Sequence, residues 1–192
     1  MKRTIRMVSV AALVALLSAT AADAQFGEGP RMRAGPAFGA ASILIFNSKR
    51  TWIQVSEVVA IERRTGVNVA AARNGAHASA RNQYAPNSGA ENAIDSAMPP
   101  ARSFHDRPGI YHSGTEGPPA ELEITFAHPA DLSRLTVYGR TDCCSDRDVY
   151  RFELLDRHGR ILQSGVIAAD NRDHAGTVMF DDSGRDRYDR RR

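Results

Sequence analysis

Two adjacent cysteines, Cys143 and Cys144, are the only thiols in the chain, and arginines stand three residues to either side of the pair, at Arg140 and Arg147. Neighbouring Cα atoms lie ~3.8 Å apart across a trans peptide, which is below the usual span of a disulfide. A bond between these two cysteines would therefore close a small, strained and rigid ring. Such a ring presents an apolar patch to its surroundings.

The residues around the cysteines could supply hydrogen-bond donors to this patch. Arg140 and Arg147 carry planar guanidinium groups, and Asp142 could hold one of them in a bidentate pair. A sugar offers oxygens as acceptors and one flat C–H face, so these residue types fit a sugar-binding site. The alternative is a solvated, salt-bridged loop without a ligand.

The beginning of the chain predicts export. Basic residues at Lys2, Arg3 and Arg6 precede an apolar stretch, residues 7–18, and the small residues at 22–24 suit a signal peptidase. We therefore expect residues 1–24 to be a signal peptide, and the mature protein to lie in the periplasm or outside the cell. In that compartment the two thiols should be oxidised, either to each other or to another chain, because no third cysteine is present.

Charge and hydropathy limit the possible partners. The formal net charge is +3, and loss of the predicted signal peptide would leave a nearly neutral chain. A nucleic-acid partner is therefore not expected, since such proteins carry a concentrated basic surface. No stretch approaches the ~20 apolar residues of a membrane span.

The mature chain is long enough for one domain with a hydrophobic core. We expect residues 25–41, which are rich in glycine and proline, to form a linker or arm. Residues 42–180 should form the domain, and residues 181–192 a charged flexible tail.

Apolar alternation in the domain is that of β-strands. Residues 121–126 and 133–140 alternate with a period of two, and residues 149–167 read as a hairpin that turns near Gly159. Residues 42–46 and 52–61 are two further β-rich runs. The sequence therefore predicts an all-β fold, an antiparallel β-sandwich with long loops at one end.

Glu57 breaks the expected pattern. It shares the predicted apolar face of residues 53–61, where a carboxylate needs a cation or several donors. The alternative is that Glu57 lies at a strand end and reaches solvent.

The segment RTDCCSDR, residues 140–147, resembles the R-x-D-x4-R/K motif of the fucolectin (F-type lectin) family, including the adjacent cysteines. The family has a galactose-binding-like jelly-roll fold and binds L-fucose through a histidine and two basic residues. The resemblance implies that Arg140 and Arg147 are the basic pair, and that a Cys143–Cys144 disulfide packs on the sugar. It also implies His112 as the histidine, with His105 as a rival.

A second part of the resemblance concerns calcium. ENAIDS, residues 91–96, is similar to the start of the family's calcium loop, which implies ligands from the Asn92 carbonyl, the Asp95 side chain and the Ala97 carbonyl. The run at residues 52–61 is similar to the family's last strand and would add Ser56 and Glu57. A circularly permuted domain, with that strand pair moved to residues 42–61, would explain its position.

No nucleophile with its base and no pair of carboxylates is evident, and the six histidines lack zinc-ligand spacing, so we do not expect an enzyme. The sequence favours an exported lectin-like module that binds fucose or a related sugar, with calcium as a possible cofactor and several copies as a means of avidity. The alternative is an envelope protein-interaction domain of the same fold without lectin activity.

Overall fold

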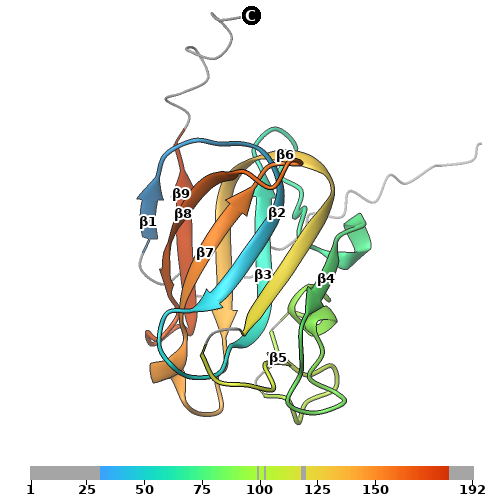
Figure 1. The fold of residues 1–192 in the computed structure, drawn as a ribbon, viewed down its shortest axis with the longest axis vertical. Helices are drawn as coiled ribbons and strands as arrows, with labels where there is room; N and C mark the ends of the chain where they lie inside the picture. Colours follow the sequence, from blue (N-terminus) through green and yellow to red (C-terminus); the bar gives the residue numbers. More distant parts are fainter. Residues whose placement is uncertain (1–30, 99, 102, 118–119, 182–192) are drawn as a thin grey trace, which may run out of the picture.

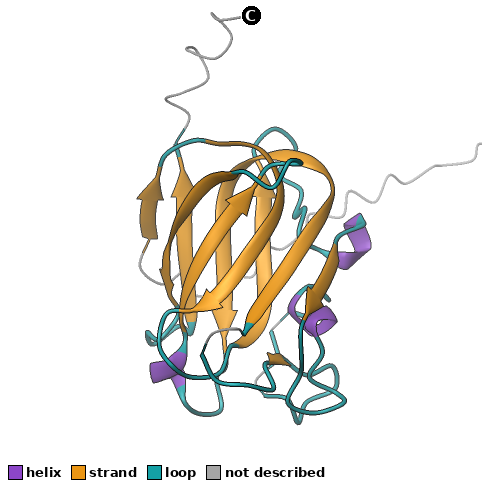
Figure 2. Ribbon diagram, in the orientation of Figure 1, coloured by secondary structure: helices purple, strands orange, loops and turns teal. Residues whose placement is uncertain are grey.

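The structure is a computed structural model that describes residues 31–98, 100–101, 103–117 and 120–181. Its regular elements are nine strands and three short 3-10 turns, so the predicted all-β fold is confirmed (Figure 2). None of the helical segments in the described part of the chain has the length and apolar character to cross a membrane. The predicted signal peptide lies outside these residues.

The elements are β1 Arg31–Ala34, β2 Ala37–Asn47, β3 Gln54–Glu62, η1 Ala72–Asn74, β4 His77–Ala80, η2 Ala90–Ala93, β5 Tyr111–His112, β6 Glu121–Gly139, η3 Ser145–Arg147, β7 Val149–Leu155, β8 Ile161–Ala168 and β9 Ala175–Phe180.

Strand β6 organises the sandwich. Its first half pairs with β2 and β4, and its second half pairs with β3 and β9, so that one strand belongs to both sides of the fold (Figure 1). Two further antiparallel pairs, β2 with β7 and β7 with β8, extend the sheet into a nearly closed sandwich, and β5 pairs with β3 in antiparallel register. Only the pair of β1 and β9 is parallel among those described.

The sequence predicted two separate strands where the structure has the single strand β6. The register against β2 shifts between the pairs Ser42–Thr125 and Ala40–Ala130, which leaves the residues around Pro129 outside the ladder. Proline has no N–H to donate and is tolerated in a strand at such irregularities. The strand therefore bends at this point and continues, instead of ending in a turn.

The predicted alternation of β6 is confirmed on both halves. Leu122 and Ile124 in the first half, and Leu135 and Val137 in the second, are fully buried in the core. Thr136 points to the other face and is buried as well, because its hydroxyl pairs with Thr177 Oγ1 on β9 at 2.9 Å.

The predicted hairpin is also confirmed. Strands β7 and β8 pair in antiparallel register, and Gly159 has a φ of +73°, a value that glycine adopts without the cost paid by other residues.

The predicted linker at residues 25–41 is wrong for its described part. Residues 31–34 form β1, and β2 begins at Ala37, five residues before the expected domain boundary at 42. Parallel pairing with β9 orders β1, and the buried side chains of Ala37 and Ala40 anchor the start of β2. The expected tail beyond residue 181 lies outside the described residues.

Strand β3 contains a bulge that alters the expected alternation. Val55 is opposite Gly139 and Glu57 is opposite Tyr138, so Ser56 is an extra residue without a partner of its own. After the bulge, Val58 and Ala60 occupy the core, and Glu57 lies on the opposite face from them. Glu57 is nevertheless fully buried, so the alternative in which it reaches solvent is wrong.

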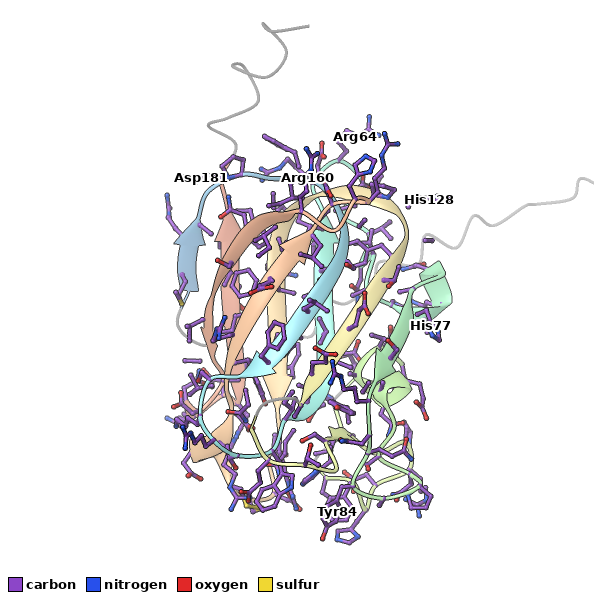
Figure 3. All side chains as sticks on the ribbon, in the orientation of Figure 1. Arg64, His77, Tyr84, His128, Arg160 and Asp181 are labelled. Carbon is purple, nitrogen blue, oxygen red and sulfur yellow. A yellow bond between two sulfur atoms is a disulfide. The ribbon has the colours of Figure 1, made fainter. Side chains whose placement is uncertain are left out.

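Connecting segments gather at the end of the sandwich where β5 lies, as the sequence predicts (Figures 1 and 2). The segment with η3, between β6 and β7, lies at the same end. Tyr84, in the segment between β4 and η2, marks this end, whereas Arg64, His128 and Arg160 mark the opposite end (Figure 3).

Candidate functional site

Residues 140–148, which we call the cysteine loop, connect β6 to β7. The guanidinium group of Arg140 donates to both carboxylate oxygens of Asp142, through Nε to Oδ1 and through an Nη atom to Oδ2 at 3.1 Å. The bidentate pair expected from the sequence is therefore present. These hydrogen bonds lower the pKa of Asp142, and only 10% of the Arg140 side chain is exposed.

Cys143 and Cys144 form a disulfide with each other, with their Cα atoms 3.8 Å apart. The alternative of bonds to another chain is thus excluded for this structure. Cys144 has a φ of +62°, and Cys143 is exposed at the surface of the loop. The ring of the vicinal disulfide is therefore accessible to a ligand.

Arg147 ends the 3-10 turn η3, and its guanidinium carbon lies 5.1 Å from the ring centre of Trp52. This is within the range of a cation–π contact. Across the described residues no carboxylate pairs with Arg147, so most of its N–H donors are available to a ligand. The planar ring of Trp52 restricts the orientation of these donors.

His112 lies on β5, within electrostatic reach of both arginines, and is 4% exposed. Its Nδ1 lies 2.9 Å from the Ser113 carbonyl oxygen, which can only accept, so Nδ1 carries the proton. Its Nε2 lies 2.9 Å from Nε2 of Gln54 and accepts a hydrogen bond from it. Burial lowers the pKa of His112, and the charges of Arg140 and Arg147 lower it further, which favours the neutral ring.

This geometry bears on the role predicted for His112. Both ring nitrogens already have partners inside the protein, and Nε2 carries no proton, so His112 could only accept a hydrogen bond from a sugar hydroxyl, and only if Gln54 moved. The ring itself remains part of the site because it packs between aromatic side chains.

Three aromatic residues that the sequence did not single out surround His112. Ring centres of Tyr84, Phe104 and Trp52 lie 4.7, 5.5 and 6.2 Å from that of His112. Phe104 also lies 5.2 Å from the guanidinium carbon of Arg140. The two arginines and His112 are therefore joined through Phe104 and Trp52.

The rival histidine, His105, joins the same cluster. It is exposed, and its ring centre lies 4.1 Å from that of Phe104. The one sequence feature that points to this cluster is the presence of aromatic residues in loops that are otherwise small and polar. Their spacing along the chain does not show that they meet.

The residues predicted to hold calcium lie on β3, in η2 and in the turn after η2. Ser96 N donates to Oε2 of Glu57 at 3.0 Å, and Ala97 N donates to Oδ1 of Asp95 at 2.7 Å. The Asn92 side chain donates to the Asn87 carbonyl at 2.8 Å, and the Ser56 hydroxyl donates to the Gly139 carbonyl at 2.7 Å. Glu57 and Asp95 therefore lie close to each other.

The second oxygen of Glu57 has an unusual environment. Oε1 is buried, and no donor reaches it from the described residues, while the carboxyl group of Asp95 lies beside Glu57. Burial raises the pKa of Glu57 to about 9, and the negative charge of Asp95 contributes to the rise. Two adjacent carboxyl groups, one of them buried, need a shared proton or a cation between them. Within the described part of the chain, no three His, Cys, Asp or Glu residues group in a way that could hold a metal.

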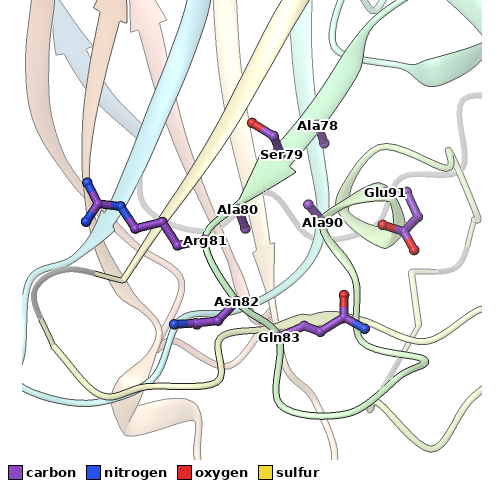
Figure 4. A pocket seen from close by; sticks show the side chains of 8 residues that line it. All are labelled: Ala78, Ser79, Ala80, Arg81, Asn82, Gln83, Ala90 and Glu91. Atoms are coloured by element: carbon purple, nitrogen blue, oxygen red, sulfur yellow. The ribbon is translucent and has the colours of Figure 1, made fainter.

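A cleft of about 420 Å³ lies beside β4, and no residue of the cysteine loop lines it (Figure 4). Small and polar side chains line it, and none of them is a predicted sugar ligand. The lining residues are Ala78, Ser79, Ala80, Arg81, Asn82, Gln83, Ala90 and Glu91.

Comparison of the chain with protein-family models, with curated proteins and with solved structures found no match. The resemblance to fucolectins thus stays a prediction from the sequence.

Proposed function

We propose that this protein is an exported, non-catalytic carbohydrate-binding module that holds fucose or a related sugar at the cysteine loop. The observation that carries the proposal is the arrangement of Arg140, Arg147 and the exposed Cys143–Cys144 ring on one loop. Guanidinium donors would bind sugar oxygens, and the disulfide and aromatic rings would contact the C–H face.

The hydrogen-bonding capacity of Arg140 supports this role. A guanidinium group carries about five N–H donors, and Asp142 uses two of them, which leaves about three for a ligand. Because the pair with Asp142 fixes the group, little side-chain entropy would be lost on binding. Arg147, whose guanidinium group is oriented by Trp52, would add further donors to the sugar.

Calcium is a separate part of the proposal. Glu57 Oε1, which lacks a donor, and the adjacent Asp95 carboxylate fit a hard cation that prefers oxygen ligands. The carbonyls of Asn92 and Ala97 would add two oxygen ligands, whereas the Ser56 hydroxyl already donates to the Gly139 carbonyl. Bound calcium would supply structural stabilisation of the turn after η2, and no chemistry.

Retention on immobilised L-fucose tests the proposed function. The oxidised protein should be retained and should elute with L-fucose, whereas glucose should not elute it. A protein that is folded, contains the disulfide and still passes through the matrix would contradict the proposal. That result would favour the protein-interaction domain, which pull-down from envelope fractions could then examine.

A further inference from the structure

Asp148 closes the cysteine loop from its far end and is fully buried. Its Oδ2 accepts a hydrogen bond of 2.9 Å from the backbone N of Arg140, and its own backbone carbonyl accepts one of 2.7 Å from Ala169 N. The carboxyl group of Asp148 therefore joins the last residue of the loop to the first, and its backbone carbonyl ties the loop to the segment after β8.

Gly139 makes this close approach possible. A Cβ atom at position 139 would lie 2.3 Å from Oδ2 of Asp148, closer than real contacts allow. Any residue with a side chain at position 139 would clash with the carboxyl group of Asp148, which explains the glycine before Arg140.

A buried chain of contacts continues from Asp148 to His112. Oδ1 of Asp148 lies 2.9 Å from the hydroxyl oxygen of Tyr150, and that hydroxyl also reaches the backbone carbonyl of Gln54. The side-chain amide of Gln54 contacts His112 Nε2 at 2.9 Å. Tyr150 and Gln54 are both buried, so this chain connects the Arg140 backbone to His112 without solvent.

The number of protons available along this series of hydrogen bonds bears on the protonation state of Asp148. The Tyr150 hydroxyl has one proton, and the Gln54 carbonyl can only accept, so that proton is best placed toward Gln54. An ionised Asp148 would then set a negatively charged oxygen against the lone pairs of the hydroxyl. A neutral carboxyl group would instead donate from Oδ1 to the Tyr150 oxygen, 2.9 Å away, and would still accept at Oδ2 from Arg140.

We propose that Asp148 is a positioning residue of the sugar site, and that its neutral carboxyl group holds Arg140 and the cysteine loop in the ligand-binding geometry. This inference rests on the proposed function of the loop. Asp148 would not touch the sugar, because it is buried behind Arg140.

The charged and titratable groups around Asp148 set its protonation. Arg140 lies on one side and favours the ionised form, whereas Asp170, after β8, favours the neutral form. A hydrogen bond donated by Tyr150 would also favour the ionised form of Asp148. Lys49 partly offsets the charge of Asp170 from 3.9 Å. Burial is the largest effect and raises the pKa of Asp148 to about 8. The loop should thus be held at neutral pH and loosened in alkaline solution.

The test compares Asp148→Asn with Asp148→Ala by fucose titration across pH. The amide of asparagine can accept from Arg140 and donate to Tyr150, as the neutral acid does. We expect Asp148→Asn to bind within about twofold of the wild type at neutral pH, and Asp148→Ala to lose about tenfold in affinity. The wild type should lose affinity above about pH 8, and Asp148→Asn should not.

Two results would overturn the inference: a wild-type affinity that stays constant through alkaline pH, or an Asp148→Asn affinity as low as that of Asp148→Ala. A measurement without ligand separates this failure from failure of the proposed function. The ¹³C shift of the Asp148 carboxyl group should titrate near the pKa stated above, and Asp170→Asn should lower that midpoint. A carboxyl group already ionised at neutral pH would contradict the inference whether or not fucose binds.

Discussion

The backbone N of Arg140 and Oδ2 of Asp148 are joined by a hydrogen bond of 2.9 Å across the cysteine loop. This bond links the residue that we expect to hold the sugar with a buried carboxyl group that cannot reach it. Effects on the stability of the fold and on the proposed ligand site can therefore be measured on the same residue.

The first prediction concerns stability and pH. The pKa of Asp148 is raised from 3.8 to about 8, so between these values the folded protein keeps a proton that the unfolded chain has released. The contribution of this group to the free energy of unfolding therefore decreases as pH rises through that window. Relative to Asp148→Asn, the wild type should lose up to about 1.4 kcal/mol per pH unit, measured by urea unfolding. The contributions of other titrating groups, His112 among them, should largely cancel in the difference between the two proteins. If the difference in their free energies of unfolding does not change with pH, the prediction is wrong.

The second prediction concerns Arg147. Replacement by alanine removes the donors held over Trp52 and should weaken fucose binding about tenfold or more. The free energy of unfolding should change by less than about 0.5 kcal/mol, because the side chain is partly exposed and no acidic partner is lost. Calorimetry and urea unfolding measure the two quantities.

Arg151→Ala is the matched control for Arg147→Ala. Arg151 makes the same kind of contact, at 5.8 Å from the ring centre of Phe46, but it lies on β7 outside the cysteine loop. Equal losses of affinity in both variants would show that the effect of Arg147 is not specific to the site.

The third prediction concerns the disulfide. Replacing Cys143 and Cys144 together by serine removes the apolar ring and should lower fucose affinity several-fold. Thermal stability should change little, because a bond between neighbouring residues restricts the unfolded chain far less than one that closes a long loop. Reduced wild-type protein should behave like the double variant, and unchanged affinity in both would remove the ring from the proposed site.

The fourth prediction concerns calcium. Saturating calcium should raise the melting temperature by stabilising the folded state, and this rise should disappear in Glu57→Gln. Glu91→Gln is the control, since it removes an exposed carboxylate next to the same turn but not a proposed ligand. If calcium does not change the wild-type melting temperature, the buried Glu57 and the exposed Asp95 beside it share a proton instead.

The sequence predicts the strands well wherever one face is buried, as at Leu122, Ile124, Leu135 and Val137. It does not predict the bulge at Ser56. A bulge changes only which face of the strand the later residues occupy, and no residue type in this strand marks its position. Nor does the sequence predict that the two halves of β6 are continuous. In both cases the pairing partner decides the conformation.

The candidate site could be predicted only where its residues are close in the sequence. Arg140, Asp142 and the cysteines lie within one loop, and their pairing was expected. Trp52 and Phe104 come from distant loops, so their contacts with Arg147 and Arg140 depend on the folded sheet.

Calorimetric titration with L-fucose is the most direct test of the proposed site, with the wild type and Arg140→Ala measured side by side. We predict saturable heat for the wild type with L-fucose, none with glucose, and none for Arg140→Ala at an unchanged circular dichroism spectrum. Absence of heat from folded, oxidised wild-type protein, or full binding by Arg140→Ala, would contradict the assignment of the cysteine loop as a sugar site.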